Sequence, residues 1–215
     1  NRTVKTMQDI LQSLRYAPFP VVAAPFGLVL GGGFETIGAC DRIVAAGESY
    51  IGLVEVGVGL IPGAGGNLRI ISNLNRKIKS SMPGAFPIIQ KAFETIGFAK
   101  VATSAKEAQA IGYLQKDDRI VVNRDYILAE AKQEVLDMSK GYTIPEVETF
   151  KLPGKSGRLV LEGTLKGFVK SGKISEHDAL IGRKLGHVLT GGDKGGPFTA
   201  VDEQYLLDIE REVFV

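Results

Sequence analysis

Cysteine, histidine and excess charge are all scarce in this chain, and each shortage excludes a class of protein. Cys40 is the only cysteine among the 215 residues, so no intrachain disulfide can form and we expect a reducing compartment, the cytoplasm. With no histidine near it in sequence, Cys40 is expected to pack rather than react. The only histidines, His177 and His187, lack the spacing of metal ligands. The net charge is +2 with Lys and Arg spread along the chain, which argues against a nucleic-acid surface.

Long apolar runs are also missing, because Gly, Pro or charged residues interrupt every one of them. We therefore expect neither a membrane-spanning helix nor a signal peptide. A hydrophobic content of 44% is ample for one globular domain, alone or with an appendage. The sequence starts and stops inside helical patterns, so we interpret it as part of a longer protein.

Two nucleotide-binding patterns are incomplete. Neither glycine run completes G-x-G-x-x-G, since Thr36 and Leu68 stand where the last glycine belongs. We therefore expect no NAD site within these residues. The stretch from Gly167 to Lys173 nearly matches a phosphate-binding P-loop, but Ile174 replaces the hydroxyl that would bind Mg²⁺.

The most informative stretch is Leu30–Gly66, LGGGFETIGACDRIVAAGESYIGLVEVGVGLIPGAGG. Glu35 follows three glycines and opens an apolar segment. A triple glycine lets the backbone approach a ligand and turn sharply into a helix. Free N–H groups at a helix start favour negative charge, so an oxyanion could be held there with Glu35 beside it.

A second glutamate, Glu55, lies in GLVEVGVG with no basic neighbour in sequence. Apolar surroundings tend to raise the pKa of a carboxylic acid, which can then act as an acid. Two such carboxylates and an oxyanion site suit proton chemistry next to a carbonyl. The alternative is plainer: the glycines form turns and the glutamates are solvated surface charges.

Periodicity and turn residues predict an α/β fold. The expected helices cover residues 3–15, 34–39, 67–74, 88–98, 105–111, 125–138, 159–169, 176–189 and 200–214, and the expected strands cover 21–24, 27–30, 42–46, 49–53 and 119–122. Residues 73–84 are basic and polar, and we interpret them as a solvated loop. Ser104 and Glu107 form a predicted capping box, and Ser175 and Thr199 are predicted N-caps.

The segments PVVAAPFGLVLGGGFE, ACDRIVAA and YIGLVEVGVGLIPGAGG resemble the core of the crotonase (enoyl-CoA hydratase/isomerase) superfamily. The resemblance implies a spiral of strand–strand–helix repeats. It also implies that the N–H of Gly32, with Gly33 beside it, binds the thioester oxyanion, and that Glu35 and Glu55 flank the reacting water. A Cβ atom at Gly32 would then crowd the thioester oxygen and strain the turn.

FPIIQKAFETIGFAKVATSA and the helical tail resemble one subgroup, the long 3-hydroxyacyl-CoA dehydrogenases, which join an N-terminal NAD domain to a hydratase-like domain. We accordingly expect a crotonase-like core at residues 1–140 that lacks its N-terminal part. A linker at 141–155 and a helical C-terminal region at 156–215 follow. The basic segment 73–84 could then reach a CoA phosphate or lie over the acyl pocket.

The resemblance implies the enoyl-CoA hydratase part of a β-oxidation enzyme. We expect an enoyl-CoA thioester as substrate, a homo-oligomer, no cofactor in these residues, and NAD only in the dehydrogenase domain of the parent protein. The family takes a second oxyanion donor from a loop before Thr3 that this sequence does not include, so we expect the chain alone to hydrate poorly or not at all. Two alternatives remain: an isomerase of the same fold, and a non-catalytic docking domain.

Overall fold

The strands come in sequential pairs whose members lie in two different small sheets. The structure, a computed structural model, describes residues 2–78 and 84–214. In the first pair, β1 (Val22–Ala23) is followed by β2 (Leu28–Leu30), and in the second, β3 (Arg42–Ala46) is followed by β4 (Tyr50–Gly52). β1 runs parallel to β3 and β2 runs parallel to β4, so each pair contributes one strand to each sheet.

A helix follows each strand pair and completes one turn of a spiral. α2 (Gly32–Gly38) follows β2, and a short 3₁₀ helix, η1 (Glu55–Val58), leads from β4 to α3 (Gly66–Ile78). Two strand–strand–helix turns are therefore stacked in sequence, which confirms the expected crotonase-like spiral. β6 (Arg119–Val121) extends the first sheet beside β3.

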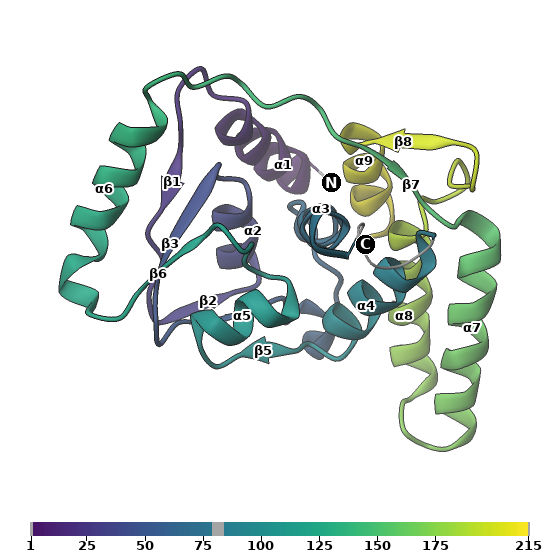
Figure 1. Cartoon of the computed structure of the whole chain (residues 1–215). Coiled ribbons are helices and arrows are strands. Elements are labelled where there is room, and N and C mark those ends of the chain that lie inside the picture. Colours follow the sequence, from purple (N-terminus) through teal and green to yellow (C-terminus); the bar gives the residue numbers. More distant parts are fainter. Residues whose placement is uncertain (1, 79–83, 215) are drawn as a thin grey trace.

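Burial on both faces explains why the central strand is apolar after its first residue. β3 has the sequence RIVAA, and its last four residues, 43–46, are all buried. α6 (Ile127–Met138) packs on the β1–β3 sheet from outside, as Figure 1 shows.

The other elements surround this spiral. They are α1 (Arg2–Arg15), α4 (Phe86–Gly97), β5 (Val101–Ala102), antiparallel to β4, α5 (Ala105–Ile111), η2 (Arg124–Tyr126), β7 (Thr149–Lys151), α7 (Gly154–Lys170), α8 (Glu176–Leu189), β8 (Ala200–Asp202) and α9 (Glu203–Val213). α7 and α8 form an antiparallel hairpin that extends to one side of the spiral in Figure 1, and α9 lies near α1. Leu161, Leu185 and Leu206 of these tail helices belong to the same apolar cluster as Phe34 and Ile51 of the spiral.

The predicted loop at residues 73–84 is wrong for its first half. α3 continues through Ile78 because its buried face, including Ile70, Ile71 and Leu74, carries the helical period past residue 73. Arg76 stays on this helix and forms an ion pair with Glu148. Residues 79–83 lie outside the described part of the chain.

The predicted N-cap at Thr199 is also wrong. Residues Ala200–Asp202 form β8, which pairs antiparallel with β7, and the helix begins only at Glu203. Asp202 is the cap, since its carboxylate accepts the N–H of Tyr205 at 2.8 Å. A short amphipathic strand directly before a helix keeps an apolar pattern that continues into the helix, so periodicity alone merges the two.

Two other predicted caps hold. Ser175 and Asp178 form a complete capping box at the start of α8. At α5, Ser104 accepts the N–H of Glu107, while the Glu107 carboxylate accepts the N–H of Thr103 at 2.7 Å rather than that of Ser104. Within the described residues, no helix is both long enough and apolar enough to cross a membrane.

Candidate active site

The triple glycine forms the junction between β2 and α2. Gly31 has φ = 54°, a left-handed backbone that favours glycine, and its N–H donates to the carbonyl of Gly52 at 2.8 Å, which ties the turn to β4. The carbonyl of Gly31 accepts the N–H of Glu35 at 3.1 Å. The N–H groups of Gly32, Gly33 and the next residue therefore have no carbonyl partner inside the helix. Gly32 and Gly33 are exposed, so a ligand can reach them.

Glu35 points from α2 into the turn that precedes α3. Its side chain is 4% exposed, and its Oε1 accepts the N–H of Ala64 at 2.8 Å and that of Gly66 at 2.9 Å. Burial raises the pKa of Glu35 to about 7, although these N–H groups oppose the shift by stabilising the ionised form. The charge of Glu55 raises the pKa of Glu35 further.

Glu55 begins η1, directly after β4, and lies against the glycine turn. A Cβ atom at Gly31 would come within 2.8 Å of its Oε1. Within the described part of the chain, Oε2 of Glu55 is buried and has no hydrogen-bond partner. Burial raises the pKa of this carboxyl, and the N–H groups of Glu55 and Val54 partly offset it. Oε2 of Glu35 lies beside Gly32, so the structure brings Glu35 and Glu55 to the glycine turn at Gly31 and Gly32, close enough for their charges to interact.

Two glycines that the sequence interpretation did not single out make room for these carboxylates. At Gly66, a Cβ atom would lie 3.0 Å from Oε1 of Glu35 and 2.8 Å from Leu53. Gly31 combines its positive φ with the close approach to Glu55. By contrast, a Cβ atom at Gly32 would meet nothing nearer than Oε2 of Glu35, at 4.0 Å, and the φ of Gly32 is not in the left-handed region. The expected backbone strain at Gly32 is therefore wrong.

Another buried carboxyl, Glu210 of α9, reaches the turn before α3 at which Glu35 accepts its hydrogen bonds. It is 1% exposed, and its Oε1 accepts the N–H of Gly65 at 2.7 Å. Sequence reasoning missed it because no glycine or special neighbour surrounds it. Helical periodicity could have found it, since Glu210 lies three and four residues after the buried Leu207 and Leu206.

The other candidate sites considered in the sequence, the P-loop-like stretch and Cys40, do not form a second active site. Gly167 lies inside α7, so the stretch that resembles a P-loop begins as helix rather than as a phosphate-binding loop. Cys40 is half-buried, and burial raises the pKa of its thiol to about 11, so little reactive thiolate forms. Across residues 2–78 and 84–214, no group of three or more His, Cys, Asp or Glu side chains is arranged to hold a metal ion.

Comparison with known proteins shows what the chain is similar to. Residues 1–83 match the family model described as Enoyl-CoA hydratase/isomerase, and the chain has the crotonase fold. The crystal structure of enoyl-CoA hydratase from Bacillus anthracis has the same fold, with a TM-score of 0.51 and 24% identity over 87% of this chain and 60% of that one. Enoyl-CoA hydratase from Thermoplasma volcanium aligns with a TM-score of 0.50 and 22% identity, covering 86% and 60% of the two chains.

Among curated proteins, one match runs along almost the whole chain. It is a "Probable 3-hydroxyacyl-CoA dehydrogenase" of Bacillus subtilis (strain 168), 45% identical over 214 residues, or 99% of this chain and 26% of that protein. Human mitochondrial methylglutaconyl-CoA hydratase is 38% identical over 111 residues, 52% of this chain and 29% of that protein. The chain therefore spans only about a quarter of the length of each of these two relatives.

Proposed function

We propose that this chain is the hydratase part of a longer 3-hydroxyacyl-CoA dehydrogenase and adds water across the double bond of a 2-enoyl-CoA thioester. The observation that carries the proposal is the meeting of Glu35 and Glu55 at one glycine turn, with the pKa of each raised by burial. Carboxyls with raised pKa values in one site are suited to exchanging protons near neutral pH.

The reaction needs one proton removed and one delivered. Water adds at Cβ of the enoyl group as a carboxylate takes its proton, and a protonated carboxyl gives its proton to Cα. Because Glu35 has a pKa of about 7 and interacts with Glu55, the two can hold a single proton between them at neutral pH. We treat them as a coupled pair rather than assigning the acid and the base individually.

The orientation of the two carboxyls fits a shared water. Oε1 of Glu35 is fixed by the N–H groups of Ala64 and Gly66, while Oε2 of Glu55 lacks a partner within the described residues. A buried acceptor without a partner is costly, and a bound water or substrate would satisfy it. In the proposed complex, the N–H of Gly32 donates a hydrogen bond to the thioester oxygen, on which negative charge develops.

An apolar cavity beside η1 suits the acyl chain. Its volume is about 220 Å³, and it adjoins the two residues that follow Glu55 in sequence. Its lining includes Val56, Gly57, Phe93, Phe98 and Phe168. An aliphatic chain would bury apolar surface there, which favours a fatty acyl thioester as substrate.

The dehydrogenase part of the proposal has a chemical reason. Hydration of a 2-enoyl-CoA yields a 3-hydroxyacyl-CoA, the compound class named in the description of the Bacillus subtilis relative. A protein that joins both steps would pass this product to an NAD-dependent oxidation. That NAD site belongs to the remainder of the longer protein.

The test is an assay of the full-length parent protein with crotonyl-CoA and with a long-chain enoyl-CoA, with and without NAD⁺. We expect 3-hydroxyacyl-CoA to form without NAD⁺, and NADH to appear only when NAD⁺ is present. A shifted double bond with no hydration would identify an isomerase instead. Failure to bind acyl-CoA at all would favour a docking role.

A further inference from the structure

Two buried carboxyls bind alternate N–H groups of the turn before α3. Glu35 accepts from Ala64 and Gly66, at 2.8 and 2.9 Å, and Glu210 accepts from Gly65, which lies between them, at 2.7 Å. Glu35 comes from α2 of the spiral and Glu210 from α9, near the end of the tail. The turn is therefore held by two carboxyls that lie 175 residues apart in the sequence.

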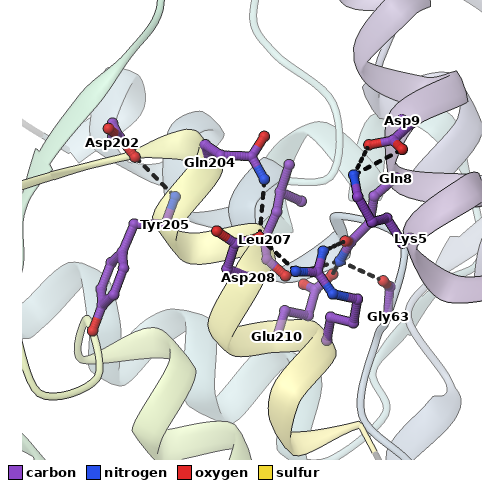
Figure 2. Close-up of polar contacts among 11 residues, drawn as sticks. Lys5, Gln8, Asp9, Gly63, Asp202, Gln204, Tyr205, Leu207, Asp208 and Glu210 are labelled. Atoms are coloured by element: carbon purple, nitrogen blue, oxygen red, sulfur yellow. Dashed lines mark hydrogen bonds and ion pairs between the residues drawn. The ribbon is translucent and has the colours of Figure 1, made fainter. Parts of the chain in front are cut away.

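Glu210 is itself fixed by further contacts. Its Oε2 accepts from Nδ2 of Asn67 at 2.8 Å, and its Oε1 lies 3.4 Å from the donor Nε2 of Gln8. Gln8 also donates to the carbonyls of Gly63 and Leu207, at 2.9 and 3.0 Å. Figure 2 shows Gln8 of α1 reaching toward both Gly63 and α9. Hydrogen bonds thus connect Gly63 of the turn to α1, and Gly65 of the turn to α9, which also binds Asn67 of α3.

Placing a carboxyl here is expensive. Burial, and then the charge of Glu35, raises the pKa of Glu210 to about 8. A neutral acceptor would satisfy the N–H of Gly65 with a smaller desolvation cost. The contacts of Glu210 therefore matter for more than the packing of α9.

We propose that Glu210 is a positioning residue for Glu35: by holding Gly65, it keeps the N–H groups of Ala64 and Gly66 directed at the Glu35 carboxylate. The effect on catalysis rests on the proposed hydratase function. The effect on the ionisation of Glu35 does not, because it follows from the hydrogen bonds alone.

The charged surroundings of the pair are few. Glu35 faces Glu55 from η1, and Glu210 faces Glu35 from α2. Arg69 of α3 interacts electrostatically with Glu210 but directs its guanidinium to Gln12 and Glu203. Gln8 and Asn67, which donate to Glu210, are neutral, and Arg211 of α9 donates to Oε1 of Gln8 at 3.0 Å.

The test follows the titration of Glu35 by ¹³C NMR of the glutamate side-chain carboxyls in this chain, with the Glu35 signal assigned by its loss in Glu35→Gln. In Glu210→Leu, which removes the acceptor for Gly65, we expect the titration midpoint of Glu35 to rise by about one pH unit because the turn no longer directs N–H groups at the carboxylate. Glu210→Gln keeps an acceptor oxygen, so we expect the midpoint to stay near its original value.

The wild-type Glu35 signal should include a step from the ionisation of the nearby Glu210, and Glu210→Gln should remove that step. Glu203→Gln is the matched control: it removes another buried carboxyl of α9 that binds Gln12 rather than the turn, and it should not move the Glu35 midpoint. An unchanged midpoint in Glu210→Leu would overturn the proposal. If that variant does not fold, an unchanged Glu35 midpoint in Glu210→Ala, which removes the same acceptor with a smaller side chain, would overturn it equally.

Activity separates this inference from the proposed function. In the full-length parent, the acidic limb of the kcat/KM–pH profile should move upward in Glu210→Leu and be largely restored in Glu210→Gln. A shifted NMR titration in a protein without hydratase activity would leave the positioning role intact and reject the hydratase. Hydratase activity with an unshifted titration would support the hydratase and reject the positioning role of Glu210.

Discussion

The segment Leu30–Gly66 and helix α9 each bring a buried carboxyl to the turn before α3, but they do so in different ways. The first segment supplies Glu35, with Glu55 at the neighbouring Gly31–Gly32 turn, in a backbone that leaves Gly32 exposed. The second supplies Glu210 from the buried face of an ordinary amphipathic helix. Glycine marks carboxyls that must approach a ligand, whereas a carboxyl that only holds backbone needs nothing beyond a helix face.

The comparison predicts that substitutions in the first region lower activity more than stability. The largest effect should come from Glu35→Gln and Glu55→Gln in the full-length parent, each lowering hydration on the order of 10²- to 10⁴-fold because proton transfer is lost. Thermal melting should change little, since a site built for reactive carboxylates is not optimised for stability.

Turnover by enoyl-CoA assay and melting by circular dichroism measure both parts of this prediction. Glu94→Gln, on the exposed side of α4, is the control, and it should leave both unchanged. Near-normal turnover in both variants would mean that the two carboxyls lie close together but take no part in proton transfer.

A second prediction concerns the chain alone. The family resemblance implies another oxyanion donor from a loop before Thr3, so this 215-residue chain should fold but show kcat/KM on the order of 10²- to 10³-fold below that of a chain extended upstream. The loss acts on the transition state and should appear in kcat/KM rather than in binding alone. Equal kcat/KM for the two chains would show that the oxyanion is held by other groups.

A third prediction separates the neighbouring glycines Gly31 and Gly32. Gly31→Ala should destabilise the fold by about 1–3 kcal/mol, because its φ of 54° is unfavourable for alanine and the new Cβ would meet Glu55 at 2.8 Å. Gly32→Ala should melt like the wild type, because its Cβ meets nothing within 4.0 Å in the protein. Any loss of hydration in Gly32→Ala then reports contact with the ligand. A fully active Gly32→Ala would show that the triple glycine serves only to form a turn.

Local signals explain what could be predicted from sequence. The order of strands and helices in the spiral was recognisable because the last four residues of β3 form an apolar run and because glycines and prolines separate the elements. Ser175 was identifiable as a cap from its spacing to Asp178 alone. The meeting of Glu35 and Glu55 came from family resemblance, since nothing in their spacing of 20 residues places them together.

Tertiary contacts explain what was missed. α3 extends past residue 73 because its apolar face, including Leu74, is buried against the core, and Arg76 on the extension pairs with Glu148, 72 residues away. β8 exists because β7 lies beside it, although Ala200–Asp202 continues the pattern of the helix that follows. Glu210 was missed because its partners, Gly65, Asn67 and Gln8, lie more than 140 residues away in sequence.

The smallest predicted effect is on stability, and it links the two regions through pH. Burial raises the pKa of Glu35 to about 7 and that of Glu210 to about 8, from an ordinary value of 4.5. Between pH 4.5 and these raised pKa values, the folded chain retains protons on Glu35 and Glu210 that the unfolded chain has released. The free energy of unfolding must therefore fall as pH rises, and level off above about 8.

Melting temperature measured from pH 6.5 to 8.5 tests this dependence. His187 has a lowered pKa and makes stability rise with pH, but only below its ordinary value of 6.5, so this range excludes it. We expect the melting temperature to fall by on the order of a few degrees across the range. Glu210→Gln should flatten the slope by removing one of the two groups, whereas Glu203→Gln should preserve it. A melting temperature that rises with pH would mean that the N–H groups of the turn stabilise the ionised carboxylates more than burial penalises them.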